Sequence, residues 1–235
     1  YSVGSFHTHR ADLNAQFIEH ETGLIIRPTL GLNYSKNDYR MKNVEVRNES
    51  KDKFIVGNPK RFHDAYFSLW GQVEVGTTGK PWADEFFVSA SYSKTDKELQ
   101  TGSVQSRVYG MAERKSDAWN MVMRYRKQHF ILKNMRLNAS LSHTWDHSLT
   151  VDTAYRKYYW DGGYIISQRN EIMGRKPSMR HYKRPLTVLR ANLDYRPNIH
   201  HNFNLNYHLS RTGNDRYDET DKDFIPANDV VTKHI

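Results

Sequence analysis

The sequence predicts an all-β chain, an antiparallel up-and-down meander that forms part of a transmembrane β-barrel. Three observations predict this fold class. Apolar and polar residues alternate with a period of two in eight segments. Short and long connections between these segments take turns, and aromatic residues gather at both ends of the apolar faces.

The first four segments, 10–17, 23–34, 65–75 and 86–93, each oppose an apolar face to a polar one, with Ile25 as an exception. β-Branched and aromatic residues within them favour strands. Their apolar faces are, in order, Ala11, Leu13, Ala15 and Phe17; Leu24, Ile26, Pro28, Leu30, Leu32 and Tyr34; Ala65, Phe67, Leu69, Gly71, Val73 and Val75; and Phe86, Val88, Ala90 and Tyr92.

The last four segments, 118–126, 135–145, 187–195 and 202–210, repeat the pattern against polar faces rich in Asn, Ser and Arg. Their apolar faces are Trp119, Met121, Met123 and Tyr125; Met135, Leu137, Ala139, Leu141, His143 and Trp145; Leu189, Ala191, Leu193 and Tyr195; and Phe203, Leu205, Tyr207 and Leu209.

The connections between segments also alternate. Those near 18–23, 77–85, 127–134 and 196–201 are short, whereas those at 35–64, 93–117 and 146–185 are long. Outer-membrane barrels have short turns on one side and long loops on the other. After the eighth segment we expect a long polar loop, and then a further β-prone segment, VVTKHI. The chain is therefore expected to be a consecutive piece of a larger barrel.

Aromatic residues lie at both ends of the apolar faces, as they do at the two membrane–water interfaces. Next to long loops are Tyr34, Phe67, Tyr92, Trp119 and Trp145, and next to short turns are Phe17, Phe86, Tyr125, Tyr195 and Phe203. The apolar face is thus expected to meet lipid, and the polar face a wet or plugged lumen. The alternative is a soluble antiparallel sandwich or superhelical sheet, whose strands also alternate.

Composition excludes some classes. The chain has 235 residues and no cysteine, so it can form neither disulfides nor thiolate metal sites. No run of about 18 apolar residues exists to form a transmembrane helix. The formal net charge of +9 suits an anionic partner such as nucleic acid, lipopolysaccharide or phospholipid headgroups. The mean hydropathy of −0.83 comes from polar faces and loops.

Several stretches resemble the barrel domain of TonB-dependent outer-membrane receptors of the Bacteroidetes type. They are GSFHTHRADLNAQF, LNYSKNDYRMKNVEV, KRFHDAY, FFVSASYSKTDKELQTG, SHTWDHS with DTAYRKYYWDG, and LNYHLSRTGNDRYDE. The resemblance implies that residues 1–235 are part of a barrel of about 22 strands, whose plug domain and remaining strands lie outside this sequence. It also implies a place in the outer membrane of a Gram-negative bacterium.

The function that this resemblance implies is energy-coupled uptake of a scarce solute through a plugged barrel, without enzyme activity or a cofactor. The implied partners are outer-membrane lipid and lipopolysaccharide, a small solute, and an inner-membrane TonB-type energy-coupling complex reached through the missing plug region. A surface lipoprotein is a further candidate partner, and no nucleic acid is expected.

Candidate ligand contacts are polar and aromatic residues that face the lumen near the long loops. They are Tyr66, Ser68, Trp70, Asn120, Ser142 and Thr144, with Asn206 and His208 as weaker candidates. A further set, nearer the turns, is expected to form charge pairs with one another or with the plug: Glu74, Arg124, Arg136, Arg190 and Asp194.

Other patterns suggest other functions. His7 and His9 would share a strand face as two metal ligands, but no third ligand is identifiable, so no metal site is expected. In WDHS, His147 and Ser148 have the residue types of a hydrolase but not the spacing, because strand neighbours point to opposite faces. A small barrel enzyme acting on envelope lipids remains an alternative, as does a soluble β-rich binding domain. The basic stretch 168–185 is expected to be a loop, although it could grip phosphates of nucleic acid.

Overall fold

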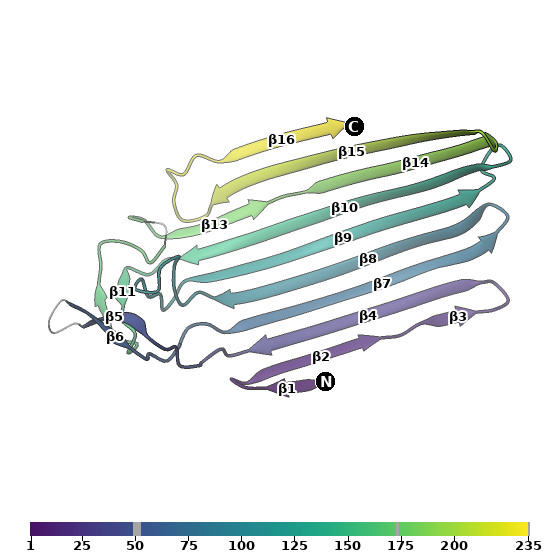
Figure 1. Ribbon diagram of the computed structural model, residues 1–235. Helices are drawn as coiled ribbons and strands as arrows, with labels where there is room; N and C mark the ends of the chain where they lie inside the picture. The colour runs from purple at the N-terminus through teal and green to yellow at the C-terminus, as the bar shows by residue number, and fades with distance from the viewer. Residues whose placement is uncertain (49–52, 173, 235) are drawn as a thin grey trace.

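The computed structural model describes residues 1–48, 53–172 and 174–234, and within these ranges the chain is all-β and antiparallel. Figure 1 shows one large sheet of long strands. No helix that could cross a membrane occurs in the described ranges. The main sheet has 12 strands there: β1 (Ser2–Gly4), β2 (Thr8–Asn14), β3 (Phe17–Glu19), β4 (Leu24–Ser35), β7 (Tyr66–Lys80), β8 (Ala83–Glu98), β9 (Glu113–Gln128), β10 (Met135–Asp152), β13 (Ser178–Lys183), β14 (Leu186–Asn198), β15 (His201–Asp218) and β16 (Ala227–His234).

Successive strands of the main sheet are neighbours in space, which makes it an up-and-down meander. Segment β3 continues β2 along β4, and β14 continues β13 between β10 and β15. The strand segments nearest the N- and C-termini lie at opposite sides of the sheet in Figure 1. Long connections lie at one end of the strands, here called the loop end, together with the short turn between β1 and β2, and the other short turns lie at the opposite end, the turn end.

Each of the eight predicted segments coincides with strand structure to within a residue at its ends, except that Ala15 and Gln16 interrupt the first between β2 and β3, so the period-two alternation is confirmed as a strand signal. The sheet nevertheless has 12 strands in the described part rather than about eight. The predicted polar loop after residue 210 is partly wrong, because β15 continues to Asp218 and only residues 219–226 separate it from β16. The β-prone segment near 230 is confirmed as β16, although Ile235 lies outside the described residues.

The expectation that 168–185 is a loop is wrong for residues 178–183, which form β13. This strand lacks an apolar face because it pairs with equally polar parts of β10 and β15, as in His147 with Lys183 and Arg180 with Asp218. Pro185 separates β13 from β14, since proline has no N–H to give to a ladder. Its carbonyl accepts a hydrogen bond of 2.8 Å from the backbone N–H of Gly213. A Cβ at Gly213 would lie 2.8 Å from the Pro185 ring, so glycine makes room for the break.

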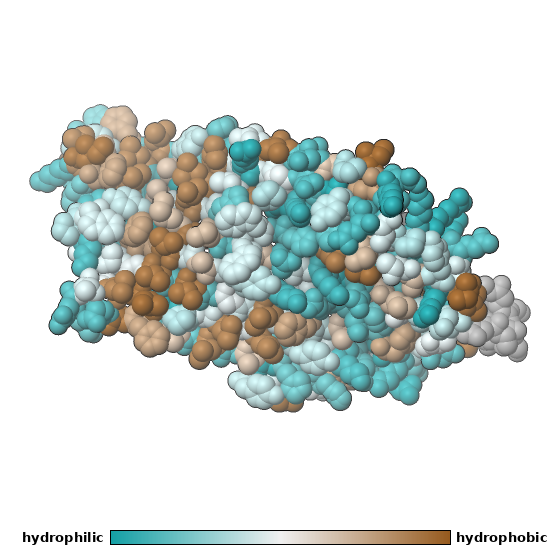
Figure 2. All heavy atoms as spheres, turned by 180° about the vertical axis from the view of Figure 1, so that it is seen from behind, coloured by the Kyte–Doolittle hydropathy of each residue, from teal (hydrophilic) through white to brown (hydrophobic). Residues whose placement is uncertain are grey.

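The strand register joins the apolar faces of the eight predicted segments into one continuous surface, here called the apolar face. One row across it runs Val88, Met123, Leu141, Leu189 and Leu209, each directly opposite the next. This face is open: Leu13 is 60% exposed, Trp119 55% and Leu205 65%. Figure 2 shows hydrophobic residues gathered over the part of the molecule away from the loop end, and hydrophilic residues toward the loop end. The main sheet therefore exposes the kind of surface that a soluble sandwich buries.

The aromatic residues predicted to form two bands lie opposite one another in the register. Toward the loop end Tyr92, Trp119 and Trp145 form one row, in which the Tyr92 and Trp119 ring centroids are 4.8 Å apart. Toward the turn end, Phe86 pairs with Tyr125, and Tyr195 with Phe203. Between the rows the apolar face is mostly aliphatic.

A compact core lies in the loops instead of the sheet. Met41, Val44, Val108, Tyr158 and Trp160 form a buried cluster contributed by three long connections. These connections also contain two small hairpins, β5 (Val44–Asn48) with β6 (Lys53–Gly57) and β11 (Arg156–Tyr158) with β12 (Tyr164–Ile166). The loops thus form an ordered cap.

Candidate functional site

The face of the sheet opposite the apolar face is here called the polar face, and its turn-end half holds an interlocked group of charges. Glu74 is 7% exposed, and its carboxylate binds both Arg27, at 2.9 Å, and Arg124. The two guanidiniums lie over the Phe87 ring, 5.0 and 5.6 Å from its centroid. The expected charge pairing within the turn-end set is therefore confirmed for Glu74 with Arg124, whereas Arg136, Arg190 and Asp194 make no ion pair within that set of described residues. Cation–π contacts of this kind hold the guanidiniums in place.

A close approach of backbone allows this packing. An ideal Cβ at Gly76 would lie 2.2 Å from the Phe86 carbonyl oxygen and 2.3 Å from the Phe87 ring. Only glycine leaves Phe87 room to lie flat against its neighbour strand and under the two arginines. The alternation of hydropathy did not indicate Phe87, since an aromatic residue on the polar face contradicts it.

A groove of about 680 Å³ lies over this group. Its lining runs from Arg27 on β4 to His208 on β15 and includes Arg126 and Arg190. In a flat sheet the six strand spacings between β4 and β15 would measure about 29 Å. One groove lined from both strands therefore indicates that the sheet curls toward its polar face.

Asparagine amides form a ladder along the same groove. Asn192 donates hydrogen bonds to the side-chain oxygens of Asn204, at 3.0 Å, and Asn206, at 2.6 Å. Asn206 in turn donates to Asn204 at 2.6 Å. Asn138 lies directly opposite Asn192 in the register. The ladder fixes the orientation of these amides, so the groove floor is polar and uncharged between arginines.

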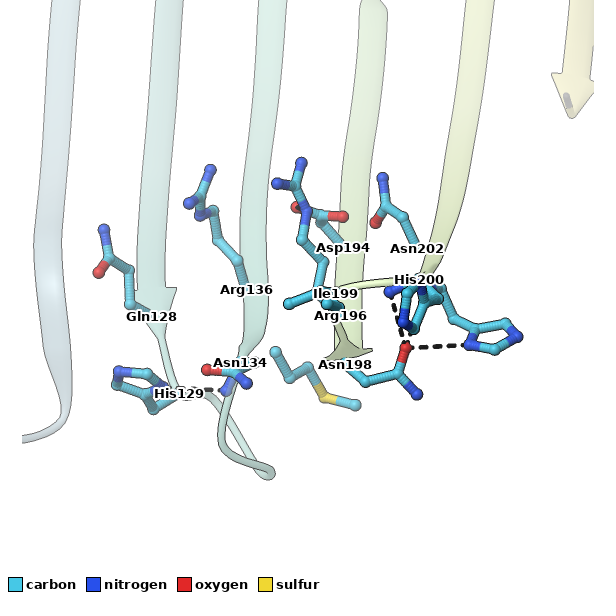
Figure 3. A pocket seen from close by; sticks show the side chains of 12 residues that line it. Gln128, His129, Asn134, Arg136, Asp194, Arg196, Asn198, Ile199, His200 and Asn202 are labelled. Carbon is cyan, nitrogen blue, oxygen red and sulfur yellow. Dashed lines mark hydrogen bonds and ion pairs between the residues drawn. The ribbon is translucent and has the colours of Figure 1, made fainter.

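A second groove, of about 710 Å³, continues the polar face to the turns (Figure 3). Gln128, Arg136 and Asp194 are register neighbours on β9, β10 and β14. Asp194 faces Arg196 at 3.6 Å, while Arg136 has no ion pair with any described residue. Below them in Figure 3 lie turn residues, among which Asn198 accepts two backbone N–H bonds at 3.0 Å, from His200 and His201. His200 lies in this turn, and His201 is the first residue of β15.

The predicted ligand contacts do not form one site. Asn120 and Thr144 are direct register partners on neighbouring strands, and Ser142 lies two residues along from Thr144. Asn206 and His208 lie opposite Asn192 and Arg190, in the turn-end half, and not near the long loops where we expected them.

The other three predicted contacts lie together on β7. Ser68 is opposite Asn33, and Trp70 covers Gly31 so closely that a Cβ there would lie 2.1 Å from its indole nitrogen. Tyr66 lines a smaller groove of about 280 Å³ at the loop end, whose charges, Lys97 and Lys115 against Asp96, Glu98 and Glu113, leave no cationic excess.

The histidine patterns do not assemble as the sequence suggested. His7 lies in a turn with a φ of 55°, before β2 begins at Thr8, so the expectation that it shares a strand face with His9 is wrong. His9 instead accepts or donates a 2.7 Å bond with Tyr1. Within the described ranges, no group of three or more His, Cys, Asp or Glu side chains has a geometry that could hold a metal ion.

His147 contacts a carboxylate, but it contacts no nucleophile. Its ring bonds Asp117 at 3.0 Å on one side and His181 at 2.9 Å on the other, and His181 lies 2.9 Å from Glu219. Ser148 alternates to the opposite face of β10 and pairs in the register with Tyr182. The WDHS segment therefore holds no serine–histidine pair, and sequence reasoning missed His181 because it comes from a distant strand.

The loop cap is held by buried carboxylates. The Glu171 side chain accepts backbone hydrogen bonds from Gly110, Met111 and Ala112 at 2.7–3.1 Å. Burial raises the pKa of Glu171 above its ordinary value, although these three bonds oppose the rise. Asp152 likewise accepts the backbone N–H groups of Glu171 and Ile172. These bonds thus connect the loops to the loop end of β10, where Asp152 is the last residue of the strand.

Asp218 ties β15 to β13 at the loop end. Desolvation raises the pKa of its carboxyl, but hydrogen bonds from Ser178 and from the backbone of Asp221, Met179 and Thr220 outweigh it, and the net pKa is lowered well below the ordinary range. The Ser178 bond is 2.5 Å long. This carboxylate therefore stays ionised at neutral pH.

A third large groove, of about 650 Å³, lies in the loop cap. Lys36, Arg40, Lys60 and Arg61 line it together with Asp38 and Asp161, and Phe62 and Trp160 supply aromatic walls. Both Lys36 and Lys60 approach the one carboxylate of Asp38, at 3.9 and 2.9 Å. Basic and aromatic side chains thus line this groove of the cap together.

No family model matches the chain, and no curated protein matches it at a significant level.

Proposed function

We propose that the chain is part of the wall of an outer-membrane transport barrel, in a receptor of the TonB-dependent type that takes up a scarce solute. The apolar face contacts lipid hydrocarbon, and the polar face lines the lumen. The loop cap lies outside the cell and captures the solute. The chain performs no chemical step in this proposal.

One observation carries the proposal: a continuous, exposed apolar face bounded by aromatic rows. Monomeric soluble proteins rarely expose apolar patches larger than a few hundred Å². On β4 the apolar face runs ten residue steps from Leu24 to Tyr34, about 34 Å along the strand. At a tilt of about 40° this rises about 26 Å, close to the apolar band of about 25 Å of outer-membrane barrels.

The polar face supports the same proposal. It carries Asn, Ser, Thr and charged side chains over most of its length, and the sheet curls toward it. A barrel that continues this curl with further strands would enclose a hydrated lumen and leave no strand edge in lipid. The strands added at β1 and at β16 belong to the proposed receptor outside these 235 residues.

The proposed mechanism has two stages. The solute first binds grooves in the loop cap and on the polar face. It then passes the barrel when a plug domain is remodelled by an inner-membrane energy-coupling complex, the partner of the proposed receptor. Lipid and lipopolysaccharide surround the apolar face, with aromatic rows at the two interfaces.

The test is made on cells that express the native gene. The envelope is fractionated, and the mobility of the polypeptide in gels is compared with and without boiling in detergent. An outer-membrane band whose mobility changes on boiling is expected. A soluble band of unchanged mobility would refute the proposal and favour a soluble β-rich binding domain.

A further inference from the structure

The turn-end half of the polar face carries more cationic side chains than carboxylates. Its two large grooves gather six guanidiniums around three carboxylates, Glu74, Glu85 and Asp194. Each carboxylate already has an arginine partner: Glu74 has Arg27 and Arg124, Glu85 has Arg126 at 2.6 Å, and Asp194 has Arg196.

Two of the arginines have no partner among the described residues. Arg136 and Arg190 are exposed and make no ion pair, hydrogen bond or ring contact with any of them. In the register Arg190 lies opposite Ser140, four residues from Arg136 on the neighbouring strand. Their backbones are therefore about 14 Å apart along the strands, and two long side chains can reach one ligand between them.

The surface between these arginines is suited to a small polar ligand. Asn138 lies there opposite Asn192, and its side-chain amide can donate hydrogen bonds to ligand oxygens, whereas the amide hydrogens of Asn192 are already donated to Asn204 and Asn206. Grooves of about 680 and 710 Å³ lie within the range of about 300–1,000 Å³ typical of small-molecule sites. Guanidinium groups pair in a fork with carboxylate and phosphate.

The cationic excess is not uniform over the grooves of the molecule. The loop-cap groove also has more cations than carboxylates, whereas the small groove at Tyr66 does not. Cations therefore concentrate at the cap and in the turn-end half of the polar face, the two places that a passing solute would occupy.

We infer that the solute is a small multivalent anion, bearing carboxylate or phosphate groups, and that Arg136 and Arg190 anchor it on the polar face. This inference rests on the proposed function, whose lumen the anion would enter. Arg27 and Arg124, held by Glu74 and Phe87, form a fixed positive wall beside the anchors. The amide of Asn138, between the two anchors, donates to the anion.

The experiment uses the native gene product purified in detergent, and calorimetric titration with citrate and with inorganic pyrophosphate. Binding of at least one is expected, and Arg136→Gln with Arg190→Gln should weaken it by about tenfold for each arginine removed. Arg211 provides the matched control. It is exposed and has no ion pair with the described residues, but it lies opposite Thr187 on the other face, so Arg211→Gln should change nothing.

Two further measurements keep the outcomes separate. Arg136→Lys with Arg190→Lys retains the charge and should retain part of the binding, and heat modifiability of every variant reports whether it folds. A folded outer-membrane protein that binds neither anion, or that binds them equally after both arginines are removed, would overturn the inference and leave the proposed function standing. Binding of poly-glutamate in place of both small anions would also overturn the inference, because the arginines would then hold an acidic polypeptide.

Discussion

Neighbouring substitutions on β9 distinguish a lipid-facing surface from a solvated one. Met123 lies in the middle row of the apolar face, 41% exposed, between Val88 and Leu141. Val122 lies on the polar face, opposite Ser89 and Ser142. Both are apolar, adjacent and in the same strand, so Met123→Lys and Val122→Lys introduce the same charge on opposite faces.

In a membrane, lysine at the position of Met123 would lie near the bilayer midplane, where it costs about 2–4 kcal/mol. At Val122 it would enter a hydrated lumen, and we expect less than about 1 kcal/mol, typical of surface changes. With an m-value of about 2 kcal/mol/M, the urea midpoint of Met123→Lys should fall by about 1–2 M. That of Val122→Lys should fall by less than about 0.5 M.

The assay is urea unfolding of the native gene product in lipid vesicles, followed by the mobility shift on gels and by tryptophan fluorescence. Equal midpoints for the two variants would refute the assignment of the faces. A larger loss at Val122 would reverse it.

Three further predictions follow from contacts on the polar face and at the loop end. Glu74→Gln should lower the free energy of unfolding by about 1–3 kcal/mol, because Arg27 and Arg124 lose their shared carboxylate; urea unfolding checks this, and an unchanged midpoint would contradict it. Gly76→Ala alone should lower the free energy of unfolding by about 1–3 kcal/mol through overpacking, since a Cβ there would lie 2.2 Å from the Phe86 carbonyl oxygen. Urea unfolding checks this as well, and a stabilised variant would show that the strands can separate. Asp218 has a lowered pKa, so its ionised form stabilises the chain above about pH 4, its ordinary pKa region, and that stability is lost as the pH falls toward the folded pKa; the midpoint difference between the wild type and Asp218→Asn should therefore shrink below about pH 4, and a constant difference would contradict this.

The alternation of hydropathy predicted the strands that carry the apolar face, because one-sided burial imposes a period of two on the sequence. It missed β13 and the outer half of β15, where both faces are polar and strand pairing is the constraint. Pro185 also hid the continuity of β13 with β14, because a proline normally argues against an interior strand position.

The grooves were harder to predict than the strands. Glu74 and Arg124 could be expected to pair because both lie near the turns on polar faces. The register that places Arg190 opposite Ser140, four residues from Arg136, depends on turn lengths, which hydropathy does not encode. Phe87 and His181 act through partners on other strands, and no local pattern indicates such contacts.

The break at Pro185 has a consequence for local opening. The ladder of β10 changes partner there, from Thr144 paired with Leu186 to His147 paired with Lys183. Cooperative unfolding units tend to end where hydrogen bonding is interrupted. Segment β13 can therefore exchange its amide protons together with the loop that precedes it while β14 stays protected. Hydrogen exchange should then show two kinetic phases, a faster one for the amides of β13 and a slower one for those of β14, with the boundary next to the Trp145 row. The loop cap can thus rearrange without loosening the strands below it.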